Sequence, residues 1–494
     1  MSQFLKSSGH MAEIALALFI GLLFGLPCMR GLPQYTLTVQ VLLIGVYIVL
    51  KRPEVALLGI LCATSSILFE DALPLVRIGI GSLHISDILL LAMLCLILIR
   101  GIVEPEFKLV RTPLDVPIFC FFGIALFSTF AAILNGSVSR VLAFRETRVL
   151  SYFLSFFIVT NMVRTKKQLK LLIYGIILLG VVVSSAMIVQ YLMGASVQLF
   201  PGRIENYSSG NAHFTDVTRI LPPGQSLVFL NFVILLTLLL VDKFHTQSIV
   251  WFLLTSLLGI GVILTFNRNF WGGISIAVAL LFVLLRDSKL KRLIPWFIII
   301  AMLLAGAIFL VVQTGSKLNS NSPMMAVISR FSTLFSRDTL NEESLRNRYL
   351  ENGYAISKVI QYPIVGMGLG AMYRPWNPNL DYGAINGDHD LRDYIHNGHL
   401  GMVVKTGLLG YASFLWFSAL FVWRGLKFWK KIQDVQDQAV FLAIFLAYMG
   451  IFVAAIVNPV FQQWFWTPVF GIIMGINELF LRFAENSKHE LAAL

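Results

Sequence analysis

The sequence predicts an all-α, polytopic integral membrane protein with about 12–14 transmembrane helices and a long, helix-containing outer loop before the last three spans. Three observations lead to this fold class. Hydrophobic residues make up 57% of the 494 residues and charged residues only 13%, whereas soluble domains carry about a quarter charged residues. Apolar runs of bilayer length recur along the chain, and basic clusters follow alternate runs.

The apolar runs are each about 16 to 28 residues long, as the thickness of a bilayer requires. They lie at 12–29, 35–50, 54–69, 85–103, 114–134, 149–163, 169–193, 226–241, 248–265, 270–285, 293–313, 397–423, 438–457 and 464–482. The first run follows Lys6 and has no small-residue cleavage site after it. We therefore interpret it as an uncleaved span and not as a signal peptide.

The positions of the basic residues predict the topology. The basic clusters that follow even-numbered runs lie at 51–52, 100–111, 164–167, 286–292 and 424–431. Cytoplasmic loops carry an excess of Lys and Arg, so these loops and both termini are predicted to be cytoplasmic. Arg140, Arg145 and Arg148 are the exception, because they follow the fifth run and fall outside. Two explanations stay open: an interfacial amphipathic helix, or a miscounted span.

The net charge of +12 does not indicate nucleic-acid binding, because basic residues in short loops fix membrane topology. Part of this charge is suited to membrane lipid headgroups or to a phosphate-bearing substrate. The cysteines lie in or beside apolar runs, without the spacing of metal ligands: Cys28, Cys62, Cys95 and Cys120. They are predicted to be small core residues and not disulfides or a zinc site.

Two outer loops are long, at 194–225 and 313–395. The second contains a predicted helix at 342–361, with Asn341 as a candidate N-cap and Pro363 after its end. One face of this helix is apolar, with Leu345, Tyr349, Ile356 and Ile360. We expect this face to pack on the membrane domain.

His396 is the leading candidate for a catalytic base, because it lies where the second outer loop re-enters the membrane. Imidazole can take a proton from a hydroxyl near neutral pH, although a lone histidine at a helix start is more often a structural hydrogen-bonding group. Asn397 is placed to cap the following helix and so to fix the orientation of His396. Asp393 or Asp390 is a candidate to orient His396 or to recognise sugar hydroxyls.

The acidic stretch 387–393 also allows a divalent cation to be considered, but its residues match no ligand spacing. A solvated loop is the simpler interpretation, so we predict no metal and no cofactor. Glycines at 366–370 follow no strand of a nucleotide-binding unit; they predict a tight turn against the membrane domain. The middles of the predicted spans hold almost no charged residues, which disfavours an ion-coupled transporter.

Four arginines are candidates to bind an anionic group on the outer side. Arg268 lies in a very short connection between two apolar runs, where a guanidinium requires water, lipid headgroups or an anionic partner. Arg219 ends a polar loop that also contains Arg203, and Arg348 lies on the predicted outer helix. A planar, permanently charged fork fits a diphosphate. The alternatives are a headgroup contact for Arg268 and a solvated helix face for Arg348.

Four segments together resemble the O-antigen ligase and O-antigen polymerase family of bacterial membrane glycosyltransferases. These are an arginine that opens an outer helix, a "Pro, two apolar, Gly, any, Gly" segment, a His-Asn pair, and a Gly-Leu-Leu-Gly segment. In this chain they lie at 348–350, 362–368, 396–397 and 405–410. Family members usually carry Ser-Arg where this chain has Asn267-Arg268, and a Pro-Asn signature that is absent after Arg219.

The resemblance implies a glycan donor attached to undecaprenyl diphosphate, an acceptor that is a glycan or the lipid A–core, and chemistry without a metal or nucleotide sugar. It also implies a bacterial inner-membrane protein with its active site on the periplasmic side. We expect an N-terminal bundle at 1–193, a catalytic region at 194–425 and C-terminal helices at 426–494. His396, Arg268 and Arg219 are the expected catalytic residues; Arg348, Arg203, Asp393 and Asn397 are expected to bind substrate.

The function predicted from these residues is metal-independent, inverting glycosyl transfer of the ligase type. A repeat-unit polymerase of O-antigen or exopolysaccharide is the nearest alternative. Further alternatives are a lipid-linked glycan transporter or flippase, another polyprenyl-phosphate glycosyltransferase, and a non-catalytic subunit of a polysaccharide assembly.

Overall fold

The computed structural model describes residues 50–65, 75–209, 212–241, 248–285, 343–376 and 391–492, and the single positions 45, 47, 67 and 327. This part of the chain is mostly helical, which confirms the predicted polytopic membrane fold. Six of its helices are long and apolar enough to cross a membrane. They are α4 (Ile85–Val103), α5 (Asp115–Leu134), α8 (Lys166–Met193), α17 (Gly398–Phe428), α18 (Val435–Ala454) and α19 (Thr467–Ala492).

Four shorter apolar helices complete the set in the described residues. They are α3 (Pro53–Thr64), α9 (Gln225–Val241), α10 (Ser248–Leu264) and α11 (Arg268–Leu284). Most predicted runs therefore coincide with a helix to within a few residues. The run at 149–163 does not, because it is divided among the end of α6 (Arg140–Ser151), the 3-10 turn Tyr152–Leu154 and α7 (Ser155–Met162). The runs at 12–29, 35–50 and 293–313 lie wholly or mostly outside the described residues.

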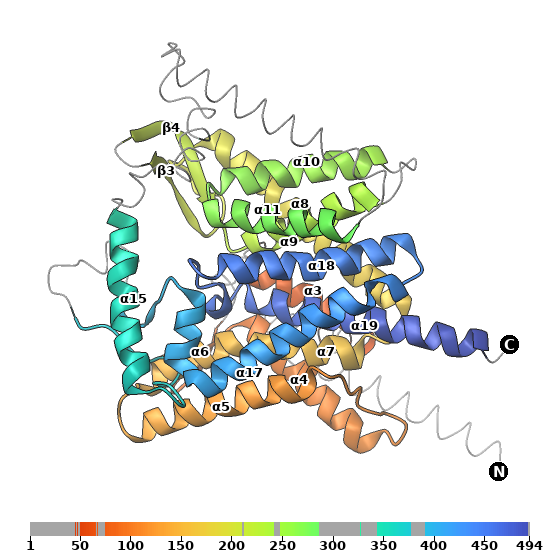
Figure 1. The fold of residues 1–494 in the computed structure, drawn as a ribbon, viewed down its shortest axis with the longest axis horizontal. Coiled ribbons are helices and arrows are strands. Elements are labelled where there is room, and N and C mark those ends of the chain that lie inside the picture. The colour runs from red at the N-terminus through yellow and green to blue at the C-terminus, as the bar shows by residue number, and fades with distance from the viewer. Residues whose placement is uncertain are drawn as a thin grey trace, which may run out of the picture.

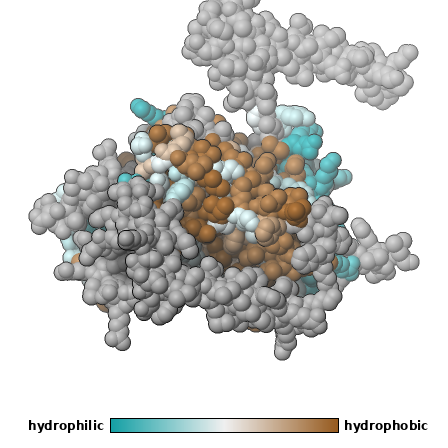
Figure 2. All heavy atoms as spheres, turned by 90° about the horizontal axis from the view of Figure 1, so that it is seen from above, coloured by the Kyte–Doolittle hydropathy of each residue, from teal (hydrophilic) through white to brown (hydrophobic). Residues whose placement is uncertain are grey.

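Hydrophobic side chains cover a broad area of the face shown in Figure 2. α10 alone exposes Ile249, Phe252 and Leu253 by more than half. A broad exposed apolar surface of this kind fits contact with lipid. Inside the bundle, one core cluster runs from Ala56 to Leu481 and contains residues from all three predicted regions.

The loop 194–225 contains a β-hairpin that the sequence analysis did not predict. Strand β3 (Arg203–Ser209) pairs antiparallel with β4 (Ala212–Leu221). A second, very short hairpin joins β1 (Val76–Ile78) and β2 (Gly81–Leu83). Both are local additions to a helical fold, and the longer one positions two of the candidate arginines.

α6 is an amphipathic helix of 12 residues that carries Arg140, Arg145 and Arg148, and the predicted run after it, 149–163, is broken into short pieces. Arg148 pairs with the buried Asp87 of α4 at 3.0 Å. Arg145 pairs with Asp393, which lies close before α17. Arg145 and Arg148 thus hold α6 against its neighbours.

The predicted outer helix exists as α15 (Glu343–Gln361). Figure 1 shows it across the ends of α5 and α17, on the side where the β3–β4 hairpin also lies. The prediction that the apolar face of α15 packs on the membrane domain is wrong, because Tyr349 is 68% exposed and Ile360 is 74% exposed. Glu351 and Ala355 are buried instead, and Ala355 joins a small apolar cluster with Tyr373, Ile395 and Val404.

Candidate functional site

The segment before α17 places His396 against the buried side of α15. Asn397 caps α17, because its Oδ1 accepts a hydrogen bond from the backbone N–H of Leu400 at 3.0 Å. This confirms the predicted cap. The Nδ1 of His396 lies 2.7 Å from Oε2 of Glu351, and its backbone N–H donates to the same oxygen at 3.3 Å. The imidazole is thus held at two points, while its side chain remains 38% exposed.

Glu351 is the orienting carboxylate, and the sequence analysis did not identify it. It is buried, and its Oε1 lies 3.4 Å from a guanidinium nitrogen of Arg374. Burial opposes its ionisation, but the hydrogen bond from His396 and the charges of His396 and Arg374 outweigh burial and hold the pKa of Glu351 below its ordinary value. Glu351 is therefore an anion at neutral pH. Glu351 lies three residues after Arg348 on the same helix face. This spacing was the sequence signal that could have identified it.

Asp393, which we expected to orient His396 or to bind substrate, forms its ion pair with Arg145. It is buried there, so its observed role is to fix the segment before α17 against α6. Asp388, His389 and Asp390 lie outside the described residues. Within the described ranges, no group of three or more His, Cys, Asp or Glu side chains has metal-binding geometry.

Tyr394 links the histidine to two of the candidate arginines. Its ring packs edge-on against the imidazole of His396, with the centroids 4.9 Å apart. Burial raises the pKa of Tyr394 to about 12; the charge of Glu351 adds to this, whereas Arg348 and Arg203 act in the opposite direction. Arg348 and Arg203 therefore lie within electrostatic range of the ring that contacts His396.

Arg219 contacts the end of α10, and Arg268 is the first residue of α11. The register of the hairpin places Arg219 opposite Glu205, and the two side chains approach to 3.3 Å. Arg203 reaches the same carboxylate at 2.8 Å. The Nε of Arg219 also donates to the backbone carbonyl of Thr265 at 3.1 Å. Two guanidinium groups thus share one carboxylate, which leaves this part of the hairpin with net positive charge.

Arg268 begins α11 three residues after Thr265, so it lies close to the residue that Arg219 contacts. Asn267 caps α11, with its Oδ1 accepting from the backbone N–H of Asn269 at 3.2 Å. The connection from α10 is short, as expected, and Phe266 adopts a positive φ of 46° in it. Tyr394 contacts His396, and Glu205 joins Arg203 to Arg219, which reaches the end of α10 at Thr265.

A glycine-rich loop packs against α17, the helix that His396 precedes. The backbone of residues 363–368 hydrogen-bonds to α17 at 404–409, where Gly407 interrupts the helix with a φ of 68°. A Cβ on Gly407 would lie 2.2 Å from the carbonyl oxygen of Ile364, and Gly366 has a φ of 74°. The predicted tight turn is confirmed, and only glycine fits its closest approach.

Lys405 and Glu146 form a buried ion pair beside this turn, at 2.6 Å. The ammonium also donates to the carbonyl of Ala371 at 3.1 Å, and Glu146 accepts from the N–H of Gly370 at 2.7 Å. The sequence analysis missed this charge within a predicted span. The pair joins α6, the glycine loop and α17, and so fixes the helix that His396 precedes.

A family model described as O-antigen ligase matches residues 252–415. The match covers about a third of the chain and shows similarity to this family over that segment. The match begins in α10, ends in α17 and includes Arg268, Arg348, Glu351 and His396. No curated protein matches the chain. The similarity supports glycosyltransferase activity as the function to propose.

Proposed function

We propose that this protein transfers a glycan from a polyprenyl (undecaprenyl) diphosphate carrier to an acceptor sugar, with inversion and without a metal, on the periplasmic face of a bacterial inner membrane. Both termini then lie in the cytoplasm. The observation that carries the proposal is the pair formed by His396 and Glu351, with Arg203 and Arg348 within electrostatic range of the tyrosine beside it. A base and a set of fixed cations are what this reaction requires.

His396 acts as the general base in this proposal. Glu351 engages Nδ1, so Nε2 accepts the proton of the acceptor hydroxyl as its oxygen attacks the anomeric carbon. The ionised Glu351 then stabilises the imidazolium that forms, as a carboxylate does in a hydrolase triad. A positioned general base contributes roughly 10² to 10⁴ in rate.

Arg219 and Arg268 hold the departing diphosphate. The bond from the anomeric carbon to the phosphate oxygen breaks as the new glycosidic bond forms, and negative charge grows on the leaving group. Fixed guanidinium groups stabilise such charge without reorganising at the moment of reaction. A diphosphate is already a good leaving group, so the reaction needs no protein acid. Arg348 and Arg203 are proposed to bind the sugars or the outer phosphate.

The acceptor decides between ligation and polymerisation. Purified protein should be given a polyprenyl-diphosphate glycan together with either lipid A–core or a second lipid-linked repeat unit. A ligase gives a single shift of lipid A–core on a gel, and a polymerase gives a ladder. Wild-type protein that binds the donor but transfers to neither acceptor, in the presence of active family controls, would refute the proposal.

A further inference from the structure

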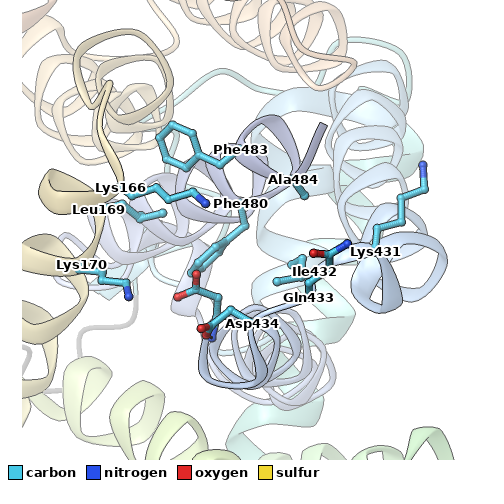
Figure 3. Close-up of a pocket in the computed structure, with 11 residues that line it drawn as sticks. Lys166, Leu169, Lys170, Lys431, Ile432, Gln433, Asp434, Phe480, Phe483 and Ala484 are labelled. Carbon is cyan, nitrogen blue, oxygen red and sulfur yellow. The ribbon is translucent and has the colours of Figure 1, made fainter. Parts of the chain in front are cut away.

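A cavity of about 200 Å³ opens at the far end of α8 and α17 from the candidate site. Figure 3 shows its lining, which comes from the start of α8, the segment between α17 and α18, and the second half of α19. α8 has 28 residues, which gives it a length of about 42 Å. The cavity is therefore about a bilayer away from the β3–β4 hairpin that follows α8.

Aromatic and basic side chains surround this end of the molecule. The ammonium of Lys427 lies 4.4 Å from the ring centroid of Trp423, and that of Lys431 lies 4.2 Å from the ring centroid of Phe428. Tryptophan and lysine concentrate where a protein meets the headgroup layer. The cavity thus opens at the level of phospholipid headgroups.

Charges of both signs line the cavity and remain apart. Lys166 and Lys170 come from α8, and Asp434 lies just before α18 (Figure 3). Asp437 lies in the first turn of α18 and also lines the cavity. Both lysines lie within electrostatic range of the Asp437 carboxylate. Among the ion pairs of the described residues, none within 4.0 Å joins these lysines to these aspartates. The lysines of α8 and the two aspartates therefore line one cavity without a direct ion pair between them, and Lys431 lines it as well.

Apolar side chains form the rest of the lining, with Leu169, Ile432, Phe480 and Phe483. The volume equals that of about seven waters at roughly 30 Å³ each. The cavity therefore suits a small polar group that carries two opposite charges and continues into an apolar chain.

We propose that this cavity binds the headgroup of a zwitterionic phospholipid, of the phosphatidylethanolamine class. Its phosphate lies against Lys166 and Lys170, its ammonium against Asp434 and Asp437, and its glycerol and first methylenes against Phe480 and Phe483. A purely anionic headgroup leaves the two carboxylates uncompensated, and a purely cationic ligand leaves the lysines uncompensated.

The test is lipid retention by the full chain. Purified protein in nanodiscs of equal phosphatidylethanolamine and phosphatidylglycerol should be released into the mass spectrometer and its bound lipids identified. Wild type should retain phosphatidylethanolamine preferentially. Lys166→Gln with Lys170→Gln should reduce that retention roughly tenfold, as expected for loss of charge-assisted contacts. Asp437→Asn should shift the preference toward phosphatidylglycerol.

Lys167→Gln is the matched control, because Lys167 is exposed on the same turn of α8 but does not line the cavity. It should leave retention unchanged. Equal retention of both lipids by wild type, or an equal loss in the control variant, would overturn the proposal. Soluble phosphoethanolamine should compete only weakly; competition as strong as that of the lipid would assign the cavity to a soluble phosphate compound instead.

Discussion

His396 and His399 lie three residues apart around the start of α17, but their surroundings differ. The Nδ1 of His396 contacts the carboxylate of Glu351, and the side chain is 38% exposed. His399 uses both nitrogens inside the bundle: Nε2 lies 2.8 Å from the carbonyl oxygen of Phe452, and Nδ1 lies 2.9 Å from the hydroxyl of Tyr411. The comparison teaches that partners, and not position in the sequence, decide which imidazole can accept a proton.

The largest effect on transfer is expected from His396→Gln. Loss of the base should lower the rate of glycan transfer by roughly 10² to 10⁴. His399→Gln is the matched variant, and it should keep turnover per folded molecule within a few-fold while lowering the thermal midpoint. Rates in purified protein with a polyprenyl-diphosphate glycan measure this difference. Equal losses in the two variants would contradict the assignment of the base.

Arg268→Lys separates phosphate binding from proton transfer. A lysine keeps the charge but cannot form the planar fork, so transfer should fall about 10²- to 10³-fold, as when an oxyanion donor is removed. A matched control is Arg77→Lys, because Arg77 lies on β1, outside the site. The same steady-state assay measures both. A fully active Arg268→Lys variant would mean that only charge, and no bidentate contact, is needed at this position.

Glu351→Gln sharpens the comparison, because it leaves His396 with a neutral partner. A hydrogen bond to a charged group contributes about 1.5–3 kcal/mol, so transfer should fall about 10- to 100-fold. Donor affinity should change little. If Glu351→Gln binds the donor far more weakly but turns over normally, then Glu351 serves substrate binding and not the base.

The pH dependence of stability follows from the same carboxylate. The pKa of Glu351 in the folded protein lies below its ordinary value of 4.5, so ionisation stabilises the fold above that pH. This contribution is lost as the pH falls through the folded pKa. Below about pH 4.5, the thermal midpoint of wild type in detergent should therefore fall more steeply with decreasing pH than that of Glu351→Gln. Parallel curves for the two proteins would show that Glu351 has no such coupling.

The smallest effect on turnover is expected from Lys405→Met. Removing one member of a buried ion pair costs about 3–5 kcal/mol, because Glu146 is left without its cation. The thermal midpoint should fall, while turnover per folded molecule should stay within about tenfold. Lys405→Met with Glu146→Gln should recover part of the stability. A large loss of turnover in folded protein would place this pair in the reaction itself.

The helices and the cap at Asn397 could be predicted because apolar runs and local hydrogen bonds are encoded within short stretches of sequence. The β3–β4 hairpin was missed, although Gly210 and Asn211 between two polar, alternating segments were a turn signal. The outward face of α15 was also misassigned, since apolar residues were expected to point toward the protein. The buried face of α15 instead carries Glu351, Ala355 and Val359, which meet His396 and a small apolar cluster.

The pairing of Glu351 with His396 joins residues 45 positions apart, and no spacing rule connects them. Arg145 with Asp393 and Lys405 with Glu146 are separated by more than 200 positions. Such contacts depend on how the helices pack. The sequence therefore singled out His396 and the arginines as candidates, whereas their carboxylate partners Glu351 and Glu205 required the structure.

An electron cryomicroscopy map of the protein with a bound polyprenyl-diphosphate glycan tests the central claim most directly. The account predicts diphosphate oxygens within roughly 3.2 Å of the guanidinium nitrogens of Arg219 and Arg268. It also predicts the Nε2 of His396 on the opposite side of the anomeric carbon, because an inverting attack comes from behind the leaving group. A diphosphate bound away from these arginines, or on the same side of that carbon as His396, would contradict it.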